Sequence, residues 1–428
     1  MTIPTGATTP IAPARATHGW WTARFGGLPG SFWRWMAVIG GGRVGFTVVP
    51  FLAFWLGSER HLSATAVAWV MAAFGAGWTA SMPLGGWLSD RIGRRAVLVY
   101  ASIAAAGAYL LLGSVGLLFR GTGGYTATMV TAALTGLCFD LYRPGVQASI
   151  SDTVPDADRG RAMAGLYLML NASRLVSSVL GGLIASGDFR WLFIGNAATS
   201  LATAYAAGRF IPAGPRRTRR PKLREKWRPV GTPFAAFTLV TFVFYTVHTQ
   251  SMVALPLVLG GHGATPMTYG LLLALDPLVV VAVQLTAQRQ IVRAPALPAC
   301  AVGVVLVGGG LAATGLSPTL GWAAATIPLW VTGEVVFLIA APTFIARLAP
   351  DHQRGRYFGA WGATQGAAAI TAPLLAAITS GSPVIWIGGA LASLVAAAAC
   401  VALHRYTAHV YTAHSYMAQP HPLEGPLA

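Results

Sequence analysis

Charged residues are scarce in this chain of 428 residues: only 10% are Asp, Glu, Lys or Arg, while 55% are hydrophobic. Soluble domains carry about 25% charged residues. The shortage therefore excludes an ordinary soluble enzyme and indicates a protein that crosses a membrane several times. The mean hydropathy of +0.60 supports the same conclusion.

Cysteine is also rare, and the three cysteines, Cys138, Cys300 and Cys400, all lie in apolar runs. Their number and setting exclude a disulfide-stapled secreted fold and a four-cysteine metal site. The sequence shows no group of ligands with metal-binding spacing. We therefore expect neither a metal ion nor another cofactor.

Acidic residues are fewer than basic ones, 12 against 29, which gives a net charge of +17. A basic surface of this strength commonly binds nucleic acid. Here, however, the basic residues lie mainly at the ends of long apolar segments. We therefore expect the lipid bilayer, and not nucleic acid, as the partner of this charge.

Twelve segments are long and apolar enough to cross hydrocarbon, which takes about 20 residues in a helix that satisfies its own backbone. The sequence thus predicts an all-α membrane protein with twelve transmembrane helices in two pseudo-symmetric six-helix bundles, residues 32–211 and 234–403. The first bundle holds segments 32–56, 64–88, 96–119, 125–150, 162–185 and 189–211. The second holds segments 234–259, 267–287, 294–316, 320–348, 357–379 and 384–403.

The basic residues also predict the orientation. With both termini inside, all of them fall on the inner side except Arg60, Arg120, Arg190 and three within the membrane. This asymmetry follows the positive-inside rule. We therefore expect a multi-pass protein of the cell inner (plasma) membrane. Its cytoplasmic parts would be the tails 1–31 and 404–428 and the basic linker 212–233.

An internal repeat supports two related halves. The sequence PDADRGR at 155–161, after the fourth segment, is similar to PDHQRGR at 350–356, after the tenth. Transporters built from such repeats bind substrate near the membrane midplane, where the halves meet, and change access by rocking one half against the other.

The loop between the second and third segments reads GWLSDRIGRR at 86–95 and matches the pattern G-x-x-x-D-R-x-G-R-[RK]. It resembles the signature loop of the major facilitator superfamily. The sequences RVG at 43–45, VPFL at 49–52 and RP at 143–144 look like the proton-linked multidrug efflux branch, the drug:H+ antiporters with twelve spans. The resemblance covers residues 32–403. It implies a monomer that exchanges a small-molecule substrate for protons, with a role in antibiotic resistance.

The resemblance also implies a cytoplasmic gate. In the family, the acid at Asp90 caps the start of helix eleven, here near 354–358, and the arginine at Arg94 pairs with the acid at Asp152. Such links can hold the inner side shut. The expected gate residues are Gly86, Asp90, Arg91, Gly93, Arg94, Arg95 and Asp152. The alternative is that these charges only set the topology.

Two stretches depart from the family pattern. The loop 288–293 of the second half keeps its arginines but lacks the aspartate, so the gate should be one-sided. The fifth segment lacks the proline of the glycine-rich motif that antiporters usually carry there. The direction of transport is therefore inferred from the family and is not read from a motif.

Charges within the predicted spans are the main candidates for function. They comprise three carboxylates, Asp140, Asp276 and Glu334, and three arginines, Arg43, Arg143 and Arg174. Each costs at least about 2.5–3.5 kcal/mol at mid-helix, so they should face a cavity or one another. Asp140 and Glu334 hold similar places in the repeat, on helices four and ten, which line the central cavity in this superfamily. We expect these two acids to face each other across the pathway.

Glu334 is the strongest candidate to carry a proton. Arg143 lies three residues from Asp140 on one helical face, which favours an ionised pair. Glu334 has apolar neighbours and no such partner in the sequence, and burial without a partner favours a neutral carboxyl group. In the efflux branch an acid in this Gly-Glu-Val context handles protons and cations, which implies the same role here. Asp276 is the second candidate, and for each acid the alternative is a structural pair with Arg43 or Arg174.

Together these features predict a secondary active transporter that exports small amphipathic compounds in exchange for protons. A proton symporter or facilitator that imports a small metabolite is the alternative, and a non-transporting membrane receptor is a third class. No phosphate-binding loop or nucleophile–base–acid arrangement indicates an enzyme. The candidate substrate contacts are Tyr142, Tyr245, His248, Gln250, Trp330 and Phe337, residue types that also pack helices together or face lipid.

Overall fold

The computed structural model describes residues 26–45, 47–118, 121–155, 158–212, 231–349, 353–379 and 382–417. These residues are helical and contain no strand. The expected N-terminal tail to residue 25, most of the linker (213–230) and the last part of the C-terminal tail (418–428) lie outside the described residues.

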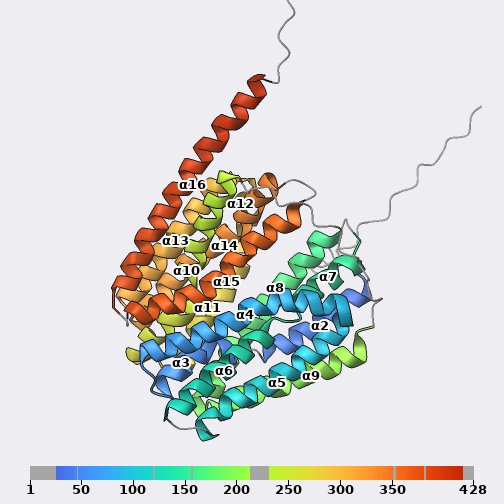
Figure 1. The fold of residues 1–428 in the computed structure, drawn as a ribbon, viewed down its shortest axis with the longest axis vertical. Helices are drawn as coiled ribbons and strands as arrows, with labels where there is room; N and C mark the ends of the chain where they lie inside the picture. The colour runs from blue at the N-terminus through green and yellow to red at the C-terminus, as the bar shows by residue number, and fades with distance from the viewer. Residues whose placement is uncertain are drawn as a thin grey trace, which may run out of the picture.

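Two bundles of helices make up the protein (Figure 1). The first contains α2 (Gly30–Val44), α3 (Val48–Ser58), α4 (Ala64–Ile92), α5 (Arg94–Leu118), α6 (Gly121–Phe139), α7 (Arg143–Thr153), α8 (Arg159–Gly187) and α9 (Arg190–Phe210). The second contains α10 (Thr232–Gly261), α11 (Pro266–Thr286), α12 (Gln288–Arg293), α13 (Ala296–Leu316), α14 (Leu320–Leu348), α15 (Arg354–Thr379) and α16 (Val384–Met417). The predicted fold class, an all-α membrane protein, is confirmed.

Nine helices in the described ranges are long and apolar enough to cross a membrane. They are α2 with α3 taken as one span, α4, α5, α8, α10, α11, α13, α14 and α16. The predicted spans that fall outside this set correspond to α6 with α7, α9 and α15. These helices pack within the same two bundles, so the structure is consistent with twelve crossings.

Polar residues start several helices where the sequence changes from loop to apolar run. The Ser63 hydroxyl accepts a hydrogen bond from the Ala66 amide, 3.2 Å away, and caps α4. Thr265 and Thr268 form a capping box at the start of α11, with Pro266 in its first turn. Each cap satisfies amide groups that have no partner within the helix, which fixes where the helix begins.

Two predicted spans are broken in the middle. The first divides into α2 and α3 near Gly45, and the fourth divides into α6 and α7 at residues 140–142. Pro144 stands in the first turn of α7, where an N–H group would have no partner within the helix. In a continuous helix the same proline would remove a backbone hydrogen bond, so it favours a break before α7. The predicted spans 32–56 and 125–150 are therefore pairs of half-helices.

The last helix is longer than predicted. The expected span ended at residue 403, whereas α16 continues to Met417 and projects beyond the bundle (Figure 1). The sequence interpretation assigned residues 404–428 to a C-terminal tail, and residues 404–417 of it continue the same helix.

The halves meet along symmetry-related helices. α8 packs against α11, α4 against α15 and α3 against α10. Thr65 and Thr79 of α4 donate hydrogen bonds to the carbonyl groups of Ala377 and Gly366 of α15, at 3.4 and 3.0 Å. These contacts lie between the start and the middle of α4, far from the 86–95 loop.

We call the end of the bundles that carries the 86–95 loop the basic end. At the opposite end the two halves pack against each other along their common boundary, which we call the seam. There the rings of Phe54 and Tyr269 stack at 5.0 Å, and the Tyr269 hydroxyl donates to the Pro50 carbonyl at 3.2 Å. Toward the basic end, where α7 and α12 lie, the bundles diverge (Figure 1). The structure is therefore one in which the halves are held together at the end remote from the loop.

Candidate functional site

Asp140 is the centre of a charged cluster within the first half. It is 2% exposed and forms an ion pair with Arg43. Its Oδ2 atom also accepts hydrogen bonds from Arg143 Nη1 at 3.1 Å and from the Trp78 indole at 3.3 Å. The Arg43 guanidinium lies 5.6 Å from the centre of the Tyr142 ring. The cluster gives the buried carboxylate two cations and one neutral donor.

The broken helices bring this cluster together. Arg43 lies in the last turn of α2, and Asp140 and Arg143 stand on either side of the break between α6 and α7. The amide of Arg143 donates to the Asp140 carbonyl at 2.9 Å, which closes the turn. Discontinuous helices in transporters commonly place polar groups at the depth of the binding site in this way.

A second pair crosses the seam between the halves. Arg174 Nη2 of α8 lies 2.7 Å from Asp276 Oδ2 of α11. The Asp276 side chain is 11% exposed and that of Arg174 is 39% exposed. The other oxygen of this carboxylate, Oδ1, has no hydrogen-bond partner in the described part of the chain. One carboxylate therefore holds the halves together with only one of its two oxygens.

Glu334 lies beside this pair and has a partner that the sequence interpretation overlooked. Nε2 of His248, on α10, is 3.1 Å from Glu334 Oε2, on α14. The expectation that Glu334 lacks a helper was wrong because the partner comes from a different helix, 86 residues away in the sequence. The ring of His248 is held by stacking on Phe244 at 5.9 Å and by an edge contact with Trp330 at 6.0 Å.

The two pairs form one network. Arg174 interacts electrostatically with both Asp276 and Glu334, and Asp276 interacts with His248. Four helices of both halves, α8, α10, α11 and α14, thus supply one group of two carboxylates, one imidazole and one partly exposed guanidinium. We call Arg174, Asp276, Glu334 and His248 the seam network. Asp140, which we expected to face Glu334, has its direct described partners within its own half instead.

The predicted substrate contacts occupy different places. Trp330 is 4% exposed and, with His248, borders the seam network, while Tyr245 is half-buried next to Phe244. The amide nitrogen of Gln250 donates to the Ala372 carbonyl of α15 at 2.9 Å, so it serves helix packing in this state.

Phe337 lies within the core of the second bundle. It is fully buried and stacks on Phe244 at 3.8 Å and on Phe237 at 6.2 Å. In this state it packs α14 against α10, and its role as a substrate contact stays a prediction.

The expected gate residues lie at the basic end. Gly93 has a φ of +90°, a conformation that favours glycine, and its amide donates to the Ser89 carbonyl at 3.2 Å, so it ends α4 and allows α5 to begin. Arg91 lies 4.1 Å from the ring centre of Trp87, and Arg95 donates to the Gly208 carbonyl of α9. Gly86 lies on α4, directly before Trp87.

Of the two links expected for a shut gate, the one from Asp90 is absent from the described contacts, and the one from Arg94 to Asp152 stays a prediction because the Asp152 side chain lies outside the described residues. Asp90 is exposed and makes no hydrogen bond or ion pair within the described ranges. The side chains of Asp152 and Arg354 lie outside the described residues, and Arg94 stands at the start of α5. The expected pairing of Asp90 with the start of α15 thus does not occur where the bundles diverge.

Two functional side chains had a usable signal in the sequence. His248 is the one histidine within a predicted span, and an ionisable residue there generally has a partner inside the bundle. Trp78 carries an indole N–H that needs an acceptor when buried. Neither signal identifies the partner, because that depends on how the helices are rotated about their axes.

Two helical bundles with a charged network at their seam define a secondary transporter, a membrane protein that moves its substrate without an enzymatic reaction. The chain belongs to the Major Facilitator Superfamily, whose family model matches residues 34–373. It is 26% identical over 349 residues to YqjV of Bacillus subtilis, an uncharacterised transporter of this type, covering 77% of this chain and 82% of the relative.

The names of two other relatives state a function. A Na+, Li+, K+/H+ antiporter of Planococcus maritimus is 24% identical over 358 residues, covering 73% of this chain and 80% of that protein. The multidrug resistance protein MdtH of Klebsiella pneumoniae is 23% identical over 287 residues, covering 64% and 67%. Among solved structures, a peptide transporter POT in complex with sulfate superposes with a TM-score of 0.72 at 16% identity, covering 91% of this chain and 97% of that one. The peptide transporter and this chain share the fold.

Proposed function

We propose that this transporter exports small amphipathic compounds in exchange for protons. The observation that carries the proposal is the Arg174–Asp276 pair across the seam, 2.7 Å long, with the Glu334–His248 pair beside it. A protonatable pair that joins the moving parts is what coupling requires, because the proton then acts directly on the contact between the halves.

The seam network provides a mechanism for exchange. A proton on Asp276 removes the negative charge that holds Arg174, and this weakens the link between the halves. A proton on Glu334 weakens the neighbouring contact with His248 within the second half. If the substrate binds only when these carboxylates are free of protons, the two ligands favour opposite-facing states and become coupled. Each charge moved inward down a potential of 100 mV contributes about 2.3 kcal/mol.

The packing supports alternating access. The halves are joined at the end remote from the 86–95 loop and diverge at the basic end. We propose that the basic end lies on the cytoplasmic side of the plasma membrane. In the opposite state, Asp90 would reach the start of α15 and Arg94 would pair with Asp152. The remaining gate residues, Gly86, Arg91, Gly93 and Arg95, would shape and hold that loop. A single chain contains both halves, so we propose a monomer.

The functions named for two relatives support antiport. One exchanges monovalent cations for protons and the other is a multidrug resistance protein. Tyr142, Tyr245, His248 and Trp330 offer rings beside acids, which suits amphipathic cations. We propose these four as substrate contacts, with Glu334 and Asp276 as proton sites and Asp140 held by Arg43 and Arg143 as a supporting charge.

Import by proton symport is the second candidate. The observation in its favour is the 39% exposure of the Arg174 side chain, which presents a guanidinium at the seam. Such a group binds carboxylates and phosphates, so it suits an anionic or zwitterionic metabolite better than a cationic drug.

Proteoliposomes with an imposed pH gradient separate these functions. An antiporter moves a test cation such as ethidium against the proton flow, a symporter moves its substrate with the flow, and a receptor moves nothing. Glu334→Gln should abolish the dependence of transport on the gradient. Gln288→Glu, in α12 at the basic end, is the matched control and should leave coupling intact. Proton-driven transport that persists in Glu334→Gln would remove Glu334 from the mechanism.

A further inference from the structure

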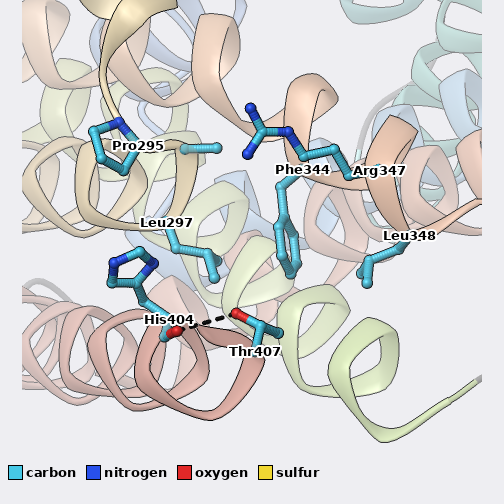
Figure 2. A pocket seen from close by; sticks show the side chains of 8 residues that line it. Pro295, Leu297, Phe344, Arg347, Leu348, His404 and Thr407 are labelled. Atoms are coloured by element: carbon cyan, nitrogen blue, oxygen red, sulfur yellow. Dashed lines mark hydrogen bonds between the residues drawn. The ribbon is translucent and has the colours of Figure 1, made fainter. Parts of the chain in front are cut away.

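A cavity of about 420 Å³ lies in the second bundle, away from the seam network. The start of α13, the end of α14 and the middle of α16 enclose it (Figure 2). Its lining residues are Pro295, Ala296, Leu297, Phe344, Arg347, Leu348, His404 and Thr407. Arg347 follows Glu334 by 13 residues on α14, about 20 Å along the helix, so the proposed transport site does not use this cavity. We call it the α13–α14–α16 pocket.

One side of the pocket is cationic. The guanidinium of Arg347 extends toward Pro295 at the start of α13 (Figure 2), and within the described ranges it has no hydrogen bond or ion pair. The ring of His404 borders the same space on the other side. The two described carboxylates of the second half, Asp276 and Glu334, lie deep in α11 and α14, so the described rim of the pocket carries no acid.

The start of α13 adds a further site for an anion. No side chain caps this 21-residue helix, whose N-cap residue is Pro295. The first turn of α13 therefore has no capping side chain, and its residues Ala296 and Leu297 line the pocket. Free amides and the helix dipole favour negative charge at this position.

The other side of the pocket is apolar. Leu297, Phe344 and Leu348 form it, and Figure 2 shows the Phe344 ring between the cationic side and α16. Nearer the membrane centre, Val401 of α16 and Val302 of α13 are 41% and 53% exposed, as residues in contact with lipid are. An occupant of this pocket would therefore meet the Arg347 guanidinium on one side and the apolar surface of Leu297, Phe344 and Leu348 beside it.

We propose that the α13–α14–α16 pocket binds an anionic phospholipid. Its phosphate contacts Arg347 and the start of α13, and its first acyl segment packs on Phe344, Leu348 and Leu297. A lipid fits better than free phosphate because half of the lining is apolar and the basic end lies at the level of headgroups. Bound there, the lipid links the ends of three helices of the second bundle.

Native mass spectrometry of the full chain tests this proposal. The purified protein is titrated with dioleoylphosphatidylglycerol and, separately, with dioleoylphosphatidylcholine. We expect one phosphatidylglycerol to bind at least about tenfold more tightly than phosphatidylcholine, and Arg347→Gln to remove most of that preference. Arg405→Gln is the matched control, since Arg405 is exposed on α16 next to the pocket but does not line it.

A second variant tests the apolar side. Leu297→Trp fills the pocket while keeping Arg347 and His404, and it should also weaken phosphatidylglycerol binding. Inorganic phosphate is added as a competitor, and no displacement of the lipid is expected at millimolar concentration. Equal binding of both lipids, equal losses in Arg347→Gln and Arg405→Gln, or displacement by inorganic phosphate would each overturn the proposal. Transport in proteoliposomes shows that each variant is folded.

Discussion

Arg174 and Asp276 join the two halves of the transporter by an ion pair with an N–O distance of 2.7 Å, and they come from α8 and α11, which pack against each other across the boundary between the halves. About two helical turns from the pair, Gly182 of α8 allows these helices to approach closely: a Cβ atom there would lie 2.9 Å from the Pro266 carbonyl oxygen. The pair is therefore held by backbone packing as well as by charge. A change at either residue should act on the relation between the halves, and not only on local structure.

Breaking this pair tests its role in coupling. Arg174→Gln leaves the Asp276 carboxylate without its cation, and we expect a loss of about 1–3 kcal/mol in the free energy of unfolding together with a loss of proton-driven transport. Asp276→Asn added to Arg174→Gln should restore stability in part, because both charges are then gone, but not the dependence on the pH gradient. Thermal unfolding in detergent and transport in proteoliposomes measure the two effects.

Arg190→Gln is the control for this prediction. Arg190 also forms an ion pair, with Asp188 at 2.8 Å, but its side chain is 71% exposed. We expect a smaller change in stability than in Arg174→Gln and unchanged coupling, because an exposed ion pair is screened by water. Equal effects of Arg174→Gln and Arg190→Gln would show that the seam pair has no special role.

The partner of Glu334 gives a second prediction. His248→Gln keeps a hydrogen-bonding side chain of similar length but removes the imidazole that can take up a proton near neutral pH. We expect transport to continue while its rate loses one titration step between pH 5 and 8, measured with a pH-sensitive dye inside proteoliposomes. His262→Gln, at the far end of α10 where the ring is exposed, should keep the wild-type profile. A profile unchanged by His248→Gln would separate the histidine from proton transfer.

The apolar pattern predicted the helices well, because a span needs length and hydrophobicity and both can be read from the chain. The predicted span 320–348 matches α14 residue for residue. The breaks at residues 45–47 and 140–142 were missed, since the hydropathy is similar on both sides of each break. Gly45 and Pro144 were the available signals, and neither one alone stops a transmembrane helix.

The charged residues were found, but their pairing was only partly predicted. Arg143 lies three positions from Asp140 on the chain, so this contact follows from helical spacing. Arg174 was considered only as one alternative partner for the acids. The Glu334–His248 contact depends on the rotation of α10 and α14 about their axes, which a hydrophobic pattern on buried helices does not define.

The loop between α8 and α9 supplies a pH prediction outside the membrane. Side-chain and backbone hydrogen bonds from Arg190 lower the pKa of Asp188 below its ordinary value. The folded state therefore gains from the ionised carboxylate above the unfolded pKa, and this gain is lost as the pH falls through the lower folded value. Asp188→Asn should be closest to wild type in stability near pH 3 and slightly less stable at pH 6. Thermal unfolding at the two values measures the difference, and a larger deficit at pH 3 would contradict the assignment.

The seam at the end remote from the 86–95 loop gives the last prediction. Gly75 of α4 lies so close to α15 that an added Cβ atom would overlap the carbonyl oxygen of Ala369. That oxygen belongs to the backbone of a packed helix and cannot move aside cheaply, so Gly75→Ala should push the halves apart at this end and favour the opposite-facing state. Gly107→Ala on α5, where a Cβ atom meets nothing within 4 Å, is the matched control. Spin labels at Glu59 and His262, on loop residues of the two halves at this end, report the distance between them. We expect the population with the longer distance to grow in Gly75→Ala and to stay as in the wild type in Gly107→Ala. An unchanged distance in a folded Gly75→Ala protein would show that this contact does not control which side is open.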